Sequence, residues 1–192
     1  MIMKIYGLLF LLLVICIPGI ADDAAITVAD VDFAQQLIHD SGTALLLNGA
    51  GVRRKWFFNV YAAGLYLPKR STRVDEILAM PGPKQIRMHF LMNVSQKKLL
   101  ATLDEGLAAN NSAEQLVALK DDVTALKALF KTVRKHDVVI IDYLPSVGTR
   151  VWMNDVLQGV IAGVALQQAV LRVWLGEKPA DEQLKKHFLG FH

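Results

Sequence analysis

The sequence predicts an α+β fold with a largely antiparallel sheet, and three observations lead to that class. The first is a long apolar stretch at 45–67 that is rich in aromatic and β-branched side chains, a composition typical of buried strands. The second is the alternation at 85–92, where apolar residues fall at every second position, as in a half-buried strand. The third is the helical periodicity of apolar residues at 112–135 and after Gly163. Because strands and helices are clustered rather than alternating, we expect an antiparallel sheet packed against helices.

The stretch at 45–67 is expected to form two strands that stop at Pro68. Arg53, Arg54 and Lys55 interrupt its apolar run, and three cations between two strands are typical of the exposed tip of a hairpin. A turn signal, Asp40-Ser41-Gly42, ends the polar segment 22–43, which predicts a short strand or an irregular lead-in. Later strands are predicted at 137–144 and in a hairpin at 149–162 that turns near Asn154-Asp155.

Capping residues delimit the predicted helices. Ser95 suits the N-cap of a helix that runs to about Ala109, and Ser112 with Gln115 makes a capping box for a helix that continues to about Lys135. Gly176 is suited to close the helix after Gly163 as a left-handed cap. Two shorter helices are predicted at 73–80 and 181–189.

The N-terminus has the pattern of a secretory signal peptide. Lys4 precedes an apolar run, Ile5 to Ile17, and small residues precede a cleavage point after Ala21. The run is short for a membrane span, which needs about 20 apolar residues, although an uncleaved anchor is the alternative. We therefore predict a signal peptide at 1–21, a single domain at 22–192, and no stable membrane span after cleavage.

Composition excludes several function classes. The only cysteine, Cys16, lies in the predicted signal peptide, so the mature chain has no disulfide and no thiol nucleophile. A net charge of +3 without a basic stripe does not favour nucleic acid. No phosphate loop or serine-hydrolase motif is present, His89 has no second histidine at ligand spacing, and we expect neither a metal nor a cofactor. The acidic pairs Asp104-Glu105 and Asp121-Asp122 are expected to face solvent on helices.

Arg53 is the candidate binding residue. It follows Gly49 and Gly51, which leave bare backbone where a ligand or another chain segment can approach closely. A guanidinium at an apolar sheet face can bind a carboxylate through two parallel hydrogen bonds. The same group could steady a phenolate or an enolate during a cyclisation, or it could form a structural ion pair, and the residues alone do not choose among these uses.

The motif Gly49-Ala50-Gly51-Val52-Arg53, followed by Gly64-Leu65-Tyr66-Leu67, resembles the signature of the chalcone isomerase-like family. Trp174-Leu175-Gly176 and Pro179 resemble the bacterial branch. The resemblance implies a large antiparallel sheet with helices packed on one face. It also implies that Arg53 matches the catalytic arginine of the plant isomerases, whereas Tyr61 stands where those enzymes have a threonine. Fatty-acid-binding relatives pair the arginine with a tyrosine near that position.

Three hypotheses follow, and the leading one is an exported, periplasmic, non-catalytic protein that binds a fatty acid or a similar amphipathic carboxylate through Arg53 and Tyr61. The alternatives are an intramolecular lyase with Arg53 and Tyr61 in the active site, and a structural or accessory envelope protein. A shared site requires both side chains on one face of the sheet. A hairpin that turns at Arg54-Lys55 separates them, whereas a three-residue turn, which places Tyr61 opposite Gly49, or a bulge brings them to the same face.

Overall fold

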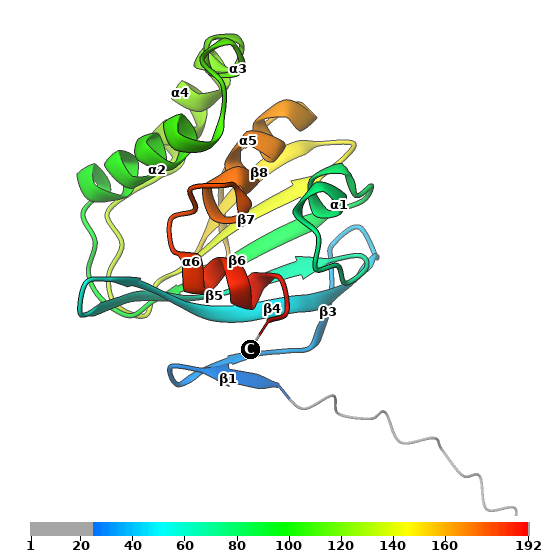
Figure 1. The fold of residues 1–192 in the computed structure, drawn as a ribbon, viewed down its shortest axis with the longest axis vertical. Helices are drawn as coiled ribbons and strands as arrows, with labels where there is room; N and C mark the ends of the chain where they lie inside the picture. Colours follow the sequence, from blue (N-terminus) through cyan, green and yellow to red (C-terminus); the bar gives the residue numbers. More distant parts are fainter. Residues whose placement is uncertain (1–24, 192) are drawn as a thin grey trace, which may run out of the picture.

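The chain folds around one curled, seven-stranded antiparallel sheet in the order β3-β4-β5-β6-β7-β8-β9. A computed structural model describes residues 25–191, so the predicted signal peptide at 1–21 lies outside the described residues (Figure 1). The strands of this sheet are β3 (Gln36–Ile38), β4 (Ala44–Lys55), β5 (Phe58–Leu67), β6 (Lys84–Phe90), β7 (Val138–Leu144), β8 (Gly148–Met153) and β9 (Val156–Ile161). Neighbours in the sheet are neighbours in sequence, which confirms the predicted antiparallel α+β class.

The helices lie on one face of the sheet, as predicted, and a small two-stranded hairpin lies on the other (Figure 1). The hairpin consists of β1 (Ile26–Val28) and β2 (Val31–Phe33). The helices are α1 (Val74–Ala79), α2 (Gln96–Asn110), α3 (Ala113–Ala118), α4 (Lys120–Leu129), α5 (Val164–Leu175) and α6 (Glu182–Phe188). The predicted caps are present: the Ser95 hydroxyl accepts a hydrogen bond from the backbone N–H of Lys98, and Ser112 and Gln115 form a capping box.

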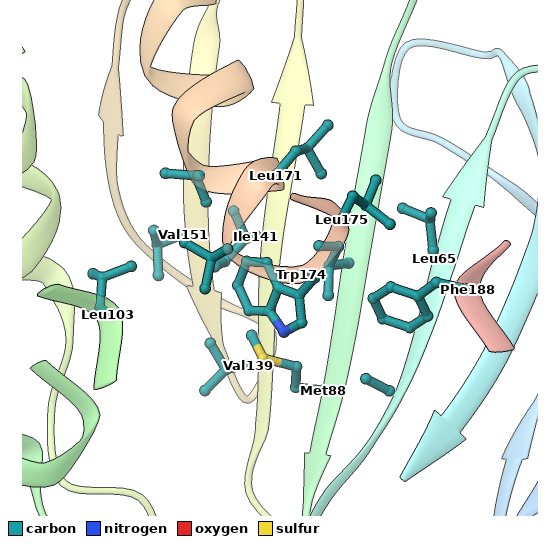
Figure 2. Close-up of a cluster of buried hydrophobic side chains, with 14 of the residues drawn as sticks. Leu65, Met88, Leu103, Val139, Ile141, Val151, Leu171, Trp174, Leu175 and Phe188 are labelled. Carbon is teal, nitrogen blue, oxygen red and sulfur yellow. The ribbon is translucent and has the colours of Figure 1, made fainter. Parts of the chain in front are cut away.

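The periodicity of each strand sorts its side chains between the two faces. Tyr61, Ala63 and Leu65 of β5 face the helices, whereas Ala62 and Tyr66 face the small hairpin, where Tyr66 packs in one cluster with Phe33. Figure 2 shows the core on the helical side, where Trp174 of α5 lies over the sheet close to Met88 and Val139. This larger core positions the candidate site.

The predicted helix from 112 to 135 is wrong in its continuity. The chain breaks at Leu119 between α3 and α4, and α4 ends at Leu129. Val133 instead pairs with Val94 through hydrogen bonds in both directions, of 2.9 and 3.0 Å. The backbone N–H and C=O of the buried Val133 both form hydrogen bonds with Val94. This tertiary contact overrides the helical pattern that the spacing of Val133 suggested.

The predicted left-handed cap at Gly176 is also wrong, because this residue ends α5 with φ of −68°. Glycine is required there for space. A Cβ at this position would lie 2.2 Å from the side-chain oxygen of Asn110. The amide nitrogen of Asn110 donates hydrogen bonds to the backbone oxygens of Gly106 and Lys178. Gly176 therefore allows the end of α5 to approach the end of α2.

The three cations Arg53, Arg54 and Lys55 do not form the hairpin tip. They belong to β4, and the turn is made by Trp56 and Phe57, because Lys55 pairs directly with Phe58. Trp56 has φ of 56°, a left-handed conformation that usually favours glycine or asparagine. The sequence pattern suggested charged residues at the tip, and the structure places aromatic residues there.

Candidate ligand-binding site

A cavity of about 550 Å³ lies between the sheet and α2, a volume within the range of small-ligand sites. Its floor is the helical face of β5, β6 and β7, with Met88, Phe90 and Ile141 among the lining residues, and its far wall is α2. Val173 and Trp174 of α5 close the inner end. Most of the lining side chains are apolar, so the cavity suits a hydrocarbon ligand.

Arg53 places a cation in this cavity. The residue is only 8% exposed, and its guanidinium carbon lies 5.7 Å from the centre of the Tyr61 ring. Within residues 25–191, its Nε atom has no hydrogen-bond partner, and no carboxylate pairs with it. A buried guanidinium with an unpartnered Nε and no paired carboxylate carries a desolvation cost, and an anionic ligand would offset that cost.

Tyr61 provides a second donor next to Arg53. Its hydroxyl oxygen accepts a hydrogen bond of 2.8 Å from the indole nitrogen of Trp174, so the hydroxyl hydrogen is free to donate to a ligand. Burial raises the pKa of Tyr61 above its ordinary value, and nearby Arg53 only partly opposes that effect. The phenol therefore stays neutral and acts as a donor at physiological pH.

The register of the β4–β5 pair brings Arg53 and Tyr61 together. A bulge lies between the pairs Arg54–Asn59 and Arg53–Tyr61, with Val60 as the extra residue. The bulge restores the common face, so Arg53 and Tyr61 are direct cross-strand neighbours. A three-residue turn would have placed Tyr61 opposite Gly49, four residues along β4 from Arg53, and the structure instead pairs Tyr61 with Arg53 itself. The condition for a shared site is met by the bulge.

The two glycines before Arg53 do not open the sheet to a ligand. A Cβ on Gly49 would lie 1.8 Å from the backbone oxygen of His187, and one on Gly51 would lie 2.4 Å from the His187 ring. The bare backbone at these glycines thus receives α6, which packs directly on β4.

Trp174 and α2 are site components that the sequence reasoning missed. Trp174 appeared only as part of a terminal motif, and its hydrogen bond to Tyr61 joins residues 113 positions apart in the chain. The α2 residues Leu99, Thr102 and Leu103 line the cavity without any distinctive spacing. No local pattern identifies such a wall, because it is defined by the distance between α2 and the sheet.

The sequence candidates His89, Asp104 and Glu105 and two asparagines at the end of α2 have structural roles or face solvent. His89 lies on the opposite face of the sheet, against the ring of Phe33, with ring centres 5.4 Å apart. Asp104 is exposed and pairs with Lys127, and Glu105 is exposed at the edge of the cavity. Asn110 and Asn111 bond to nearby backbone carbonyls. Residues 25–191 contain no cluster of three or more metal-ligating side chains.

Comparisons with known proteins agree with this architecture. The profile of a family described as chalcone isomerase-like matches residues 25–190. Among solved structures, a fatty-acid binding protein of Arabidopsis thaliana superposes with a TM-score of 0.60 over 80% of this chain and 95% of that chain, at 14% sequence identity. A comparison with curated protein sequences found no match. No helix in the described part of the chain is both long and apolar enough to cross a membrane.

Proposed function

Because the chain belongs to the chalcone isomerase-like family, we propose that it is an exported, non-catalytic binding protein for a fatty acid or a similar amphipathic carboxylate. The single observation that carries this proposal is the buried Arg53 guanidinium, which meets an apolar cavity with no carboxylate partner among the described residues. The apolar cavity suits the acyl tail of a fatty acid, and the Arg53 guanidinium suits its carboxylate.

The acyl tail is stabilised by burial in the cavity, at about 0.8 kcal/mol for each buried CH₂ group. The carboxylate accepts hydrogen bonds from Arg53 and from the Tyr61 hydroxyl, and Trp174 holds that hydroxyl in place. The fold of the Arabidopsis fatty-acid binding protein supports the same ligand class. The apolar run at 5–17 supports export to the periplasm.

The experiment has two stages. Lipids extracted from the purified protein are first identified by mass spectrometry, where a co-purifying acyl chain is the expected result. The delipidated protein is then titrated with fatty acids and with the matching fatty alcohols, which have the same tail but no carboxylate. Equal affinity for acid and alcohol would contradict the role of Arg53, and turnover of a chalcone would instead support cyclisation.

A further inference from the structure

We propose that the tip of the β4–β5 hairpin docks on the surface of an anionic lipid membrane. The aromatic tip consists of the consecutive residues Trp56, Phe57 and Phe58, which are 85%, 99% and 60% exposed. Large apolar side chains gathered on a surface mark an interaction site, whereas single ones do not. The proposal concerns this surface alone and does not depend on which ligand fills the cavity.

The backbone conformation at the tip does not favour aromatic residues, so their presence there needs an explanation. A two-residue turn at Trp56-Phe57 connects β4 and β5, and Trp56 has φ of 56°. Glycine, asparagine or aspartate would suit that conformation better and would remain hydrated. A bulky aromatic residue there costs local strain and stays 85% exposed in the isolated chain, so a partner outside the chain explains its presence.

The charge around the tip selects an anionic partner. Two loops lie beside the hairpin: the backbone N–H of Leu91 bonds to Val60, and that of Lys135 bonds to the Asn93 side chain. The three segments 53–60, 93–98 and 130–136 contain no Asp or Glu. Two carboxylates outside these ranges contact them: Asp181 accepts a hydrogen bond from the backbone N–H of Arg54, and Asp137 accepts one from that of Arg134. The exposed cations of the three segments outnumber these two acids, and they are Arg54, Lys55, Lys97, Lys98, Lys131, Arg134 and Lys135. Aromatic rings that enter the lipid headgroup region next to cations are the usual composition of a membrane-docking surface.

The aromatic tip also lies at the cavity. Trp56, Phe58, Lys55 and Lys98 contribute to its lining, while Phe57 does not. Figure 1 shows the hairpin tip at one edge of the molecule, at the same end as the start of α2 and the loop that leads into it. Docking through the tip would bring the cavity to the lipid surface. A second copy of this chain is a poorer partner, because two such basic surfaces repel each other.

Sedimentation with vesicles tests the proposal in the full mature chain. We expect binding to vesicles of equal parts phosphatidylcholine and phosphatidylglycerol, much weaker binding to pure phosphatidylcholine, and loss of binding at high salt. Emission from the exposed Trp56 should shift to shorter wavelength when anionic vesicles are added, and the Trp56→Phe variant should lack that shift. Binding that is equal for both vesicle types would contradict the charge argument.

The decisive variant is Phe57→Ser, because Phe57 does not line the cavity. Its affinity for anionic vesicles should fall about tenfold, the loss expected for one aromatic ring that no longer enters the lipid. Arg54→Gln should lower it about fivefold. The matched control is Phe191→Ser, which removes a 53% exposed ring that follows α6 and is not part of the aromatic tip, and it should leave vesicle binding unchanged.

Ligand titration of the same variants separates this proposal from the proposed function. The Phe57→Ser variant and the unmodified protein should give the same result in a fatty-acid titration. This equality is expected whether or not a fatty acid is the ligand of the cavity. Equal vesicle binding by Phe57→Ser and the unmodified protein would overturn the docking proposal. A concentration-dependent dimer that Phe57→Ser abolishes, without vesicle binding, would overturn it in favour of self-association.

Discussion

Arg53 is the residue on which the binding proposal rests, and Arg54 is its natural control. The two arginines are neighbours in β4, so their side chains point to opposite faces of the sheet. Arg53 is buried at the cavity, while Arg54 is exposed and donates from Nε to the Asn59 side chain over 3.2 Å. The same substitution at both positions therefore compares a cation in the site with one outside it.

Arg53→Ala should weaken fatty-acid binding by about 1.5–3 kcal/mol, the range for hydrogen bonds to a charged group. Arg54→Ala should change the affinity much less. Isothermal titration of the delipidated variants measures both effects, and urea unfolding checks that each variant is folded. Equal losses of affinity in the two variants would contradict the assignment of Arg53.

Trp174 should act on the ligand through Tyr61. The Trp174→Phe variant keeps an apolar ring but removes the donor to the Tyr61 hydroxyl, so we expect affinity to fall by about 1 kcal/mol. The effect should vanish when Tyr61 is already phenylalanine, because the positioned hydroxyl is then absent. Trp152→Phe, on the opposite face of the sheet, is the matched control and should bind as the unmodified protein does. An undiminished Trp174→Phe effect in the Tyr61→Phe background would mean that Trp174 acts by packing alone.

At the scale of elements, α6 packs closely on β4, the strand that carries Arg53. The approach depends on Gly49 and Gly51, since side chains on the same face of β4 would meet His187. The two glycines indicated that a ligand or another chain segment would approach this bare backbone, but they did not identify that segment as α6. That pairing was not predictable, because it joins segments about 140 residues apart in the chain.

Gly49→Ala should destabilise the protein by about 1–3 kcal/mol, as expected for overpacking in a filled core. The added Cβ meets a backbone oxygen that can move only with α6. Gly51→Ala should cost less, because its nearest contact, at 2.4 Å, is a ring atom of His187 rather than backbone, although the His187 Cβ at 2.9 Å still requires a small shift of α6. Chemical unfolding gives both values, and a smaller cost at Gly49 than at Gly51 would show that α6 shifts easily.

At the scale of the whole molecule, a buried charged cluster ties the first strands of the sheet to the last. Asp142 of β7 is 1% exposed and accepts a hydrogen bond of 2.7 Å from Nε of Arg150 on β8. His39, which follows β3, lies 2.8 Å from the other oxygen of Asp142. Arg150 also bonds to Asp40, and this contact lowers the pKa of Asp40. The cluster thereby ties the segment after β3 to β7 and β8 across the curled sheet.

Asp142→Ala should lower the free energy of unfolding by about 3 kcal/mol, because it leaves His39 and Arg150 buried without their shared acceptor. The control is Asp104→Ala, which breaks the exposed pair with Lys127 and should cost about 0–1 kcal/mol. Thermal and urea unfolding measure the difference. Equal costs would show that the buried cluster does not hold the sheet together.

The mature protein should begin at Asp22. The signal pattern predicts cleavage after Ala21. N-terminal sequencing of the exported protein checks the position. Recovery of an intact Met1 from a membrane fraction would show that residues 5–17 serve as an anchor.

The sequence by itself determined the class of the fold and the residue types of the candidate site. Alternation at 85–92 and the caps at Ser95 and Ser112 are local properties, so strands and helices could be predicted where they formed. The motif around Arg53 pointed to the cation, and the resemblance pointed to Tyr61. These features depend on neighbours in the chain, which a sequence shows directly.

Only the tertiary structure decided how these parts meet. The bulge at Val60 sets Arg53 beside Tyr61, and helix packing brings Trp174 to the Tyr61 hydroxyl. The turn at Trp56-Phe57 moves the hairpin tip from cations to aromatic rings. Each outcome depends on packing between segments that are distant in sequence, and a shift of one residue in strand register reverses the face of every side chain. Local patterns constrain that register weakly, so the site became visible only in the folded chain.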